Sequence, residues 1–288
     1  MALIGAGRVA TALAVRWAQA GYDVVAASGR GASRERARRF LSTARFYPYE
    51  QAHEGARLAQ LVVLGVPDDL IADVCGQLAG REAFRSGGHV VHLSGSVGLD
   101  ALSAAAKLGA QILSLHPLQS FPDVEEGIAR LPGSSIAVTA RNDPGFAYGE
   151  SLARAAGGTP FRLAEEVKPL YHAAAVFCSN YLVAVEGMAE HLFRLAGLED
   201  PLPSFQPLAR AAFESTFTTG PGAALTGPAA RGDAGTIARS LMALAEQAPE
   251  AVPAYVALAR VAASLAVRSG RLSPEGQARV EEVIRKWT

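Results

Sequence analysis

The chain opens with Met1-Ala-Leu-Ile-Gly5-Ala-Gly7-Arg-Val-Ala10, a short apolar run that leads into the pattern Gly5-x-Gly7-x-x-Ala10. This pattern is typical of a strand that turns into a helix beneath the pyrophosphate of a dinucleotide. Gly5 permits the tight turn, Gly7 lets the backbone approach the phosphates, and Ala10 lets the helix pack closely on the sheet. The positive end of that helix stabilises the bound anion. The stretch therefore predicts a cofactor site that includes Gly5, Ala6, Gly7, Arg8 and Val9.

The sequence around the motif supports this interpretation, because short glycine patterns also occur by chance. A helical pattern over residues 9–21 follows the loop, and residues 24–27 form an apolar run that predicts a second strand. Strand, glycine loop, helix and strand are the order that the motif requires. Only Ala2, Leu3 and Ile4 stand before Gly5, so either the first strand is short or the true start lies upstream.

The end of the predicted second strand indicates which cofactor binds. An acid there would accept hydrogen bonds from the ribose 2′-hydroxyl, but the chain has Ser28-Gly-Arg30-Gly-Ala-Ser-Arg34 instead. Hydroxyl and guanidinium groups bind a phosphate dianion, so Ser28 and Arg30 predict NADP(H). The alternative is that the arginines form the solvated face of the next helix, and we favour it for Arg36, Arg38 and Arg39.

Composition narrows the class of protein. The 288 residues are 50% hydrophobic and 19% charged, with 27 basic residues balancing 27 acidic ones. This neutrality argues against nucleic-acid binding, and the absence of a long apolar run or a leader pattern predicts a cytoplasmic protein outside the membrane. The two cysteines, Cys75 and Cys178, stand among apolar residues and predict buried free thiols. The histidines lack metal-ligand spacing, so no metal site is predicted.

The remaining pattern predicts an α/β fold with a doubly wound, mostly parallel sheet, followed by an all-α domain. Further strands are expected at residues 61–66, 89–93, 111–115, 135–139 and 161–163. Beyond residue 164 the pattern is helical: a long helix from Pro169 to at least Gly187, then helices over 207–218, 234–248, 252–269 and 274–287. We therefore predict a dinucleotide-binding domain over residues 1–164 and a helical domain for substrate binding and dimerisation over residues 165–288.

Val66 and Pro67 follow an all-apolar strand and are expected beside the nicotinamide ribose, at the carboxyl edge of the sheet. Asp68 and Asp69 come next, and we favour a role for them as caps of the following helix.

Three segments carry a family resemblance: Leu115-His-Pro-Leu-Gln-Ser-Phe121, His172-Ala-Ala-Ala-Val-Phe-Cys-Ser-Asn-Tyr181, and Leu225-Thr-Gly-Pro-Ala-Ala-Arg-Gly-Asp233. With the glycine loop and the Val-Pro-Asp-Asp turn, the chain resembles the superfamily of pyrroline-5-carboxylate reductase, ketopantoate reductase, prephenate dehydrogenase and the β-hydroxyacid dehydrogenases. Within it, the segments most resemble Rossmann-like proteins with a helical C-terminal domain of unknown function, similar to that of 6-phosphogluconate dehydrogenase. The resemblance implies NADP binding, reductase chemistry and a homodimer built on the helical domain.

His116 ends a predicted strand, so its imidazole is expected at the carboxyl edge of the sheet, facing the cleft between the domains. Gln119 and nearby amides could bind a substrate oxyanion there. Ser94 ends the preceding strand and could contact the cofactor or orient His116. Alternatively, His116 only fixes a turn before Pro117.

On the long helix, His172 and Ser179 share one face, with Asn180 at its margin. Either His172 or His116 could supply the proton that follows hydride transfer. The related dehydrogenases carry Lys and Asn four residues apart on this helix, whereas Val176 stands four residues before Asn180 here. Lys168 is a further two turns away, so we do not expect the lysine mechanism to transfer.

Arg231 lies in a polar turn before a helix and could clamp a substrate carboxylate, or it could be a surface residue. Asp233 is placed to cap that helix.

Together these residues predict an NADPH-dependent reductase of a small carbonyl or imine compound that carries a carboxylate. Ketopantoate-like 2-oxo acids are the first expectation for the substrate, and cyclic imines the second. Two alternatives stay open: an NADP(H)-binding sensor without turnover, and a dimeric interaction protein with a decayed nucleotide site.

Overall fold

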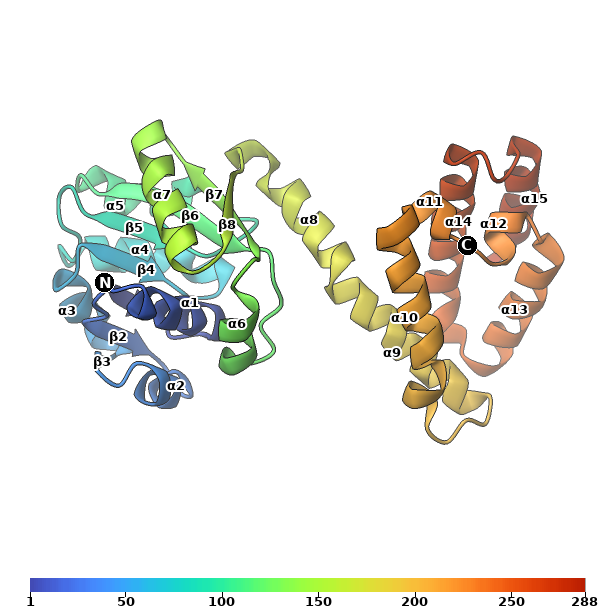
Figure 1. The fold of residues 1–288 in the computed structure, drawn as a ribbon, viewed down its shortest axis with the longest axis horizontal. Coiled ribbons are helices and arrows are strands. Elements are labelled where there is room, and N and C mark those ends of the chain that lie inside the picture. Colours follow the sequence, from blue (N-terminus) through green and yellow to red (C-terminus); the bar gives the residue numbers. More distant parts are fainter. Residues whose placement is uncertain (288) are drawn as a thin grey trace. The chain divides into compact units, whose positions relative to one another are not determined.

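The computed structural model describes residues 1–287 and divides the chain into two compact units, Met1–Asn180 and a second unit from Tyr181 onward. The first unit holds one eight-stranded sheet (Figure 1). Its strands are β1 (Ala2–Ile4), β2 (Ala26–Gly29), β3 (Arg45–Pro48), β4 (Leu61–Leu64), β5 (His89–His92), β6 (Gln111–Pro117), β7 (Ser135–Ala140) and β8 (Thr159–Arg162).

The helices of the first unit connect these strands. They are α1 (Arg8–Gln19), α2 (Ser33–Phe40), α3 (Ala52–Arg57), α4 (Ile71–Ala79), α5 (Ser103–Lys107), α6 (Val124–Arg130), α7 (Asp143–Ala155) and α8 (Lys168–Cys178). Short 3-10 turns precede several of them, including η2 (Asp68–Leu70), η3 (Leu99–Leu102) and η4 (Glu165–Val167), and η1 (Tyr49–Gln51) leads into α3.

The strand order is β3-β2-β1-β4-β5-β6-β7-β8, and every neighbouring pair is parallel except β6 and β7. The chain builds β1, β2 and β3 outward, then returns to place β4 on the other side of β1. This reversal leaves a crevice at the carboxyl ends of β1 and β4, where doubly wound sheets bind ligands.

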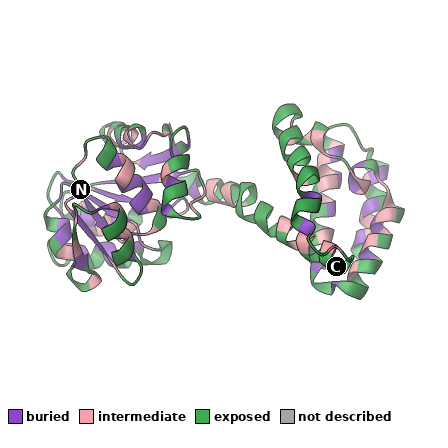
Figure 2. Cartoon of the chain, turned by 60° about the horizontal axis from the view of Figure 1, so that its bottom comes forward, coloured by how far each residue is buried: buried purple, intermediate pink, exposed green. Residues whose placement is uncertain are grey.

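Alternate strand residues enter two separate cores because successive side chains point to opposite faces of a sheet. Leu3, Val63 and Val91 pack in one core with α1, α6 and α7, whereas Ile4 and Val90 pack in another with α3, α4 and α5. Figure 2 shows the strands as buried. The predicted fold class, a mostly parallel α/β sheet followed by a helical region, is confirmed.

The glycine loop is held in place by a close backbone approach between β1 and β4. Gly5 has a φ of +90°, and a Cβ atom there would lie 2.7 Å from the Gly65 carbonyl oxygen. A Cβ on Gly65 would lie 2.4 Å from the Cβ of Ala10 and 2.5 Å from the Gly5 carbonyl oxygen. Only glycines fit at both positions, and Ala10 is small enough to let α1 sit against the β4 end.

The elements differ from those expected from the sequence in three respects. Strand β3 was not predicted: it is a four-residue edge strand that ends in Pro48, with little apolar alternation to reveal it. The long helix was predicted as continuous, but it is divided at Ser179, whose φ of −125° and ψ of −66° are not helical. Helix α8, which the sequence grouped with the helical domain, belongs to the first compact unit.

The second unit is helical. Its helices are α9 (Asn180–Leu195), α10 (Pro201–Thr219), α11 (Pro221–Ala224), α12 (Pro228–Arg231), α13 (Ala234–Gln247), α14 (Val252–Arg268) and α15 (Pro274–Ile284), with 3-10 turns η5 (Pro249–Ala251) and η6 (Arg285–Trp287). Helix α10 starts six residues earlier than predicted, at Pro201 rather than Pro207, and continues through Pro207. Asp233 caps α13 by accepting the Thr236 N–H at 3.0 Å, as predicted.

Among residues 1–287, one segment is long and apolar enough to cross a membrane by length and composition: Pro249–Arg268, of 20 residues with mean hydropathy 1.4. Val256 and Ala263 of this segment are buried in the core of the helical unit, against Ile237 and Val280. One third of the most apolar stretch of this segment is buried, so packing in this core explains only part of its apolar character.

We predict that Gly65→Ala lowers the free energy of unfolding of the first unit by about 1–3 kcal/mol, because the new methyl group overlaps Ala10 and the Gly5 backbone. Gly76→Ala is the control. It lies in α4 with no atom near the added Cβ, and it should raise stability by about 0.5–1 kcal/mol. Urea unfolding measures both. Equal stability of Gly65→Ala and the wild type would contradict the close approach.

Candidate active site at the carboxyl edge of the sheet

A cavity of 490 Å³ lies at the carboxyl ends of the central strands, within the first unit. Gly7, Arg8 and Val9 line it from the glycine loop and the start of α1, Val66 and Pro67 from the end of β4, Ser94 from the end of β5, and His116 and Gln119 from β6 and the loop beyond it. The structure therefore brings the glycine loop and His116 to one cavity, although they are far apart in the sequence.

Ser28 takes a different place from the one expected of a phosphate ligand. Its side chain is only 1% exposed, and its carbonyl oxygen accepts hydrogen bonds from the N–H groups of Gly5 and Ala6, both at 3.0 Å. Ser28 thus shapes the glycine loop through its backbone. Arg36, which we expected on a solvated face, also supports this loop: its Nε donates to the Ala6 carbonyl oxygen at 2.9 Å.

Arg30 is placed as the sequence predicted, beyond the end of β2. Its guanidinium lies over the ring of Tyr49, 3.9 Å from the centroid, and it borders two cavities of 500 and 340 Å³. Arg34 and Glu50 line the smaller one. The guanidiniums of Arg30 and Arg34 could hold a phosphate group there.

Asp68 does not cap a helix, contrary to our expectation from the sequence. The carboxylate accepts hydrogen bonds from the hydroxyls of Ser94 at 2.5 Å and Ser96 at 3.0 Å. The Ser94 hydroxyl in turn accepts from the N–H groups of Ser96 and Val97. Asp68 therefore fixes the loop that follows β5, and Ser94, which is 5% exposed, serves mainly to organise this loop.

Lys168 is the site residue that sequence reasoning dismissed. It is 1% exposed, and its Nζ donates to the Ser94 carbonyl oxygen at 3.0 Å and to the Ser114 Oγ at 2.9 Å. Burial lowers the pKa of Lys168 to about 8, against the opposing effects of Glu165 and Asp68. The sequence analysis dismissed Lys168 because it is far from Asn180 along the predicted helix. The sequence did offer one signal for this site, since its partners Ser94 and Ser114 stand at the ends of two neighbouring predicted strands.

Three ring side chains meet beside this loop. The Nδ1 of His116 lies 2.9 Å from the hydroxyl of Tyr171, and the His116 and His172 ring centroids are 5.9 Å apart. Gly95 fills the space between the two imidazoles, since a Cβ there would lie 2.8 Å from both His116 Nε2 and His172 Cδ2. Tyr171 was not foreseen from the sequence.

His92 and His116 are neutral at pH 7. Burial, and after it the neighbouring His172 and Lys168, lower the pKa of His116 to about 4. Burial and Lys168 lower the pKa of His92 to about 3. Burial raises the pKa of Tyr171 to about 12, so this hydroxyl keeps its proton. The site therefore offers neutral donors and acceptors, with Lys168 as a fixed cation behind them.

Other predicted site residues do not line this cavity. Ser179 is exposed directly after α8, and Asn180 is exposed at the start of α9, beyond the break in the helix at Ser179. Arg231 is exposed at the end of α12, in the second unit. Cys75 is buried as expected, but Cys178 is exposed, because the end of α8 has no buried residue.

No group of three or more His, Cys, Asp or Glu side chains within residues 1–287 is arranged to hold a metal ion. The glycine loop and the cavity beside it do fit a dinucleotide. The N–H groups at the start of the twelve-residue helix α1 and the open space next to Gly7 form the kind of cradle that a pyrophosphate occupies.

Comparison with known families agrees with this organisation. Residues 1–117 match the family model of a Rossmann-like domain, and residues 134–262 match a domain of unknown function, DUF2520. The resemblance predicted from the sequence, a Rossmann-like domain followed by a helical domain of unknown function, is thereby confirmed. A search of curated proteins found no match.

Solved structures share the fold. A candidate NADP oxidoreductase from Bacteroides fragilis is 22% identical, with a TM-score of 0.75 over 91% of this chain and 97% of its own. A Thermotoga maritima protein is 20% identical, with a TM-score of 0.66 over 93% and 98%. A reductive aminase from Aspergillus terreus, solved with NADPH and ethyl-5-oxohexanoate, is 15% identical, with a TM-score of 0.57 over 99% and 92%. At these identities the likeness establishes the fold alone.

We predict that acid destabilises the first unit through its buried histidines. The folded-state pKa of His92 is about 3 and that of His116 is about 4, both below the ordinary value of 6.5. As the pH falls below 6.5, these histidines bind protons in the unfolded chain but not in the folded one. The free energy of unfolding therefore decreases until the pH reaches the folded-state pKa of each histidine. Each group contributes about 1.4 kcal/mol per pH unit in that window.

His92→Asn tests this prediction, because the Asn oxygen can still accept the Ser94 N–H that His92 Nδ1 accepts at 3.2 Å. Urea unfolding between pH 7 and 4.5, read from the buried Trp17 in a Trp287→Phe background, should show a shallower loss of stability. His191→Asn, on an exposed residue of the second unit, is the matched control and should leave the slope unchanged. If the free energy of unfolding of His92→Asn falls with pH as steeply as that of the wild type, His92 does not cause the acid destabilisation and the prediction is wrong.

Proposed function

We propose that the protein is an NADPH-dependent reductase of a small carbonyl or imine compound that carries a carboxylate. The observation that carries this proposal is the 490 Å³ cavity bordered by the glycine loop at Gly7 and by His116, whose Nδ1 is 2.9 Å from the Tyr171 hydroxyl. A dinucleotide cradle and a proton-bearing pair beside one cavity are what hydride transfer to a C=O or C=N bond requires.

Several residues would hold the cofactor, which supplies the hydride when bound. The N–H groups at the start of α1 face the pyrophosphate, and Val66 and Pro67 border the ribose next to the nicotinamide. Arg30, stacked on Tyr49, and Arg34 bind the 2′-phosphate, which selects NADPH over NADH. The relatives support this choice, since one is named for NADP and another was solved with NADPH.

His116 delivers the proton to the oxygen or nitrogen that becomes negative as the hydride arrives. In the tautomer in which Nδ1 accepts from Tyr171, Nε2 carries the proton and lies beside Gly95. As Nε2 gives up this proton, the Tyr171 hydroxyl passes its own to Nδ1, and solvent restores the hydroxyl. His172, whose ring is 5.9 Å away, is the alternative donor.

The carboxylate of the substrate is the part of the proposal that depends most on the family resemblance. Gln119 lines the cavity, and its Nε2 donates to Ser134 Oγ at 3.2 Å, which holds the amide at the rim. We take 2-oxo acids as the first substrate class and cyclic imines as the second.

The test begins with fluorescence titrations of NADPH and NADH. We expect NADPH to bind more tightly and Arg30→Ala to weaken NADPH by about tenfold or more, because a charge-assisted phosphate contact is lost, while NADH changes little. Arg38→Ala, on an exposed arginine of α2, is the control. Absorbance assays with 2-oxo acids and imines then follow NADPH oxidation, which Tyr171→Phe should slow by about 100-fold or more without changing NADPH affinity.

Two results would reject the reductase. NADPH binding without oxidation by any member of the panel would favour a sensor without turnover. Failure of both nucleotides to bind at micromolar concentrations would favour an interaction protein with a decayed nucleotide site.

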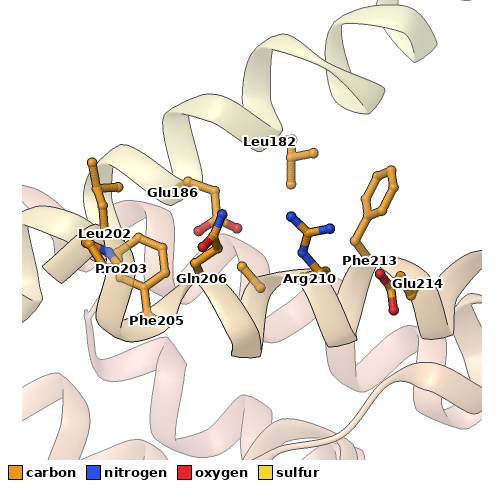
Figure 3. Close-up of a pocket in the computed structure, with 10 residues that line it drawn as sticks. Leu182, Glu186, Leu202, Pro203, Phe205, Gln206, Arg210, Phe213 and Glu214 are labelled. Atoms are coloured by element: carbon orange, nitrogen blue, oxygen red, sulfur yellow. The ribbon is translucent and has the colours of Figure 1, made fainter.

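We also propose that the protein forms a homodimer through its helical unit. A groove of 720 Å³ runs between α9 and α10 (Figure 3) and is lined by Leu182 and Glu186 on one side and Arg210 and Phe213 on the other. Val183, Leu208 and Phe217 are exposed on the same helices, at 70%, 70% and 71%. Glu186 and Arg210 in one groove give the self-complementary charges that a two-fold interface needs, so a second copy of this chain is the occupant we expect.

Light scattering after gel filtration should give the mass of a dimer for the wild type and of a monomer for Leu208→Asp with Phe213→Asp, because burying two carboxylates opposes association. Leu58→Asp, at a leucine 50% exposed in the first unit, should remain dimeric. A wild-type protein that stays monomeric at micromolar concentrations would overturn this proposal.

A further inference from the structure

Lys168 presents an unusual arrangement: a buried lysine that donates hydrogen bonds to two neutral oxygens. Its Nζ contacts the Ser94 carbonyl oxygen and the Ser114 hydroxyl, and none of the ion pairs formed within residues 1–287 involves it. The side chain is 1% exposed. Burying a charge without an ion-pair partner costs free energy, so Lys168 lowers the stability of the fold. This cost points to a role other than stabilisation.

The contacts of Lys168 join three parts of the first unit. Lys168 begins α8, Ser114 lies in β6, and Ser94 lies in the loop after β5. The Ser114 hydroxyl also donates to the Ser94 carbonyl oxygen, at 3.1 Å, so that oxygen accepts from both residues. Asp68, in η2, holds the same loop through the Ser94 hydroxyl. The loop is therefore fixed from η2, β6 and α8 together.

The position of this loop determines the position of His116. Gly95 follows Ser94 directly and touches the rings of His116 and His172 with no room for a Cβ atom. Lys168 is also one helical turn before Tyr171 and His172 on α8, so anchoring Lys168 places the Tyr171 hydroxyl against His116 Nδ1. Both contacts of the His116 ring thus depend on the one buried ammonium group.

The charge of Lys168 acts on the histidines as well. Lys168 is among the groups that lower the pKa of both His92 in β5 and His116 in β6. The carboxylates that face it are Asp68 in η2 and Glu165 in η4, and both favour its charged form. Glu165 is itself bound to the Leu99 N–H at 2.6 Å, and Asp68 to the two serine hydroxyls.

We propose that Lys168 is a positioning residue that locks the loop from Leu93 to Val97 against α8 and so holds His116 in its hydrogen bond to Tyr171. The proposal rests on the proposed function only in naming His116 as the group that delivers the proton. Lys168 does not touch the substrate or the cofactor, since it is buried and does not line the cavity. It acts through His116.

The experiment is a pH titration of the histidine Cε1–H signals by NMR, in protein labelled with ¹³C-histidine and free of nucleotide. The chain has six histidines, and the His116 signal is assigned by its loss in His116→Gln. In Lys168→Met we expect the His116 midpoint to rise by about one pH unit or more, because the neighbouring cation is gone. Lys168→Arg, which keeps the cation, should restore the wild-type midpoint, and Lys107→Met, an exposed lysine, should match the wild type.

Thermal unfolding separates positioning from simple support of the fold. Loss of a buried charge should leave the melting temperature of Lys168→Met unchanged or higher. A lower melting temperature with shifts of all six signals would instead indicate a structural role and overturn the proposal, as would an unchanged His116 midpoint. If Lys168→Met does not fold, the same titration of the wild type tests the proposal. The His116 signal of the wild type should then shift with a midpoint near pH 8, where Lys168 loses its proton. The His116 signal of Lys168→Arg should not show that shift.

No nucleotide or substrate enters these measurements. If the protein fails to bind NADPH, the proposed reductase function is refuted, but the His116 titration still tests the role of Lys168. Conversely, if the protein is a working reductase and Lys168→Met leaves the His116 midpoint unchanged, the proposed function stands and the proposed role of Lys168 is refuted.

Discussion

The backbone contact between Gly5 and Gly65 is the constraint on which the site depends. A Cβ on either glycine would lie 2.7 Å or less from the backbone of the other, so the ends of β1 and β4 can approach this closely only with glycine at both positions. That approach sets where α1 begins and where the chain leaves β4 toward Pro67. The N-terminal end of α1 and the loop at Pro67 therefore border one cavity, and this close packing forms the space that we propose for the dinucleotide before any side chain with a polar group is considered.

A second constraint orders the polar half of the site. Asp68, Ser94, Ser114 and Lys168 form a connected set of hydrogen bonds in which Asp68 is exposed and the other three residues are buried, and such networks are rigid when every member is satisfied. Its rigidity passes to His116 through Gly95, which has no side chain to absorb a displacement. Asp68 and Ser94 border the cavity together with His116, whereas Ser114 and Lys168 hold the loop without lining the cavity. Such fixed surroundings are how pre-organised sites limit the motion of a group.

The sequence was sufficient for the parts of the fold that depend on local pattern. Apolar runs located β4 to β7, and the glycine spacing located the turn after β1, because each depends on neighbours within a few residues. Strand β3 was missed because a short edge strand needs no apolar alternation. Lys168 and Tyr171 were missed for another reason: their partners come from β5 and β6, more than fifty residues earlier, and helical spacing on α8 contains no information about those strands.

The same distinction explains why Asp68 was misassigned. An acid at the start of a helix has a local use as a cap, and the local use is the one a sequence pattern predicts. Pro67 starts the turn instead, and the carboxylate faces the serines of the next loop, where it accepts two hydroxyl hydrogen bonds. Lys168 reaches the same loop from α8, so the loop is held by an exposed carboxylate and a buried ammonium group. His92 and His116 stay neutral beside it because burial leaves an added proton poorly solvated and Lys168 repels that proton, so each ring keeps one nitrogen that donates and one that accepts at neutral pH.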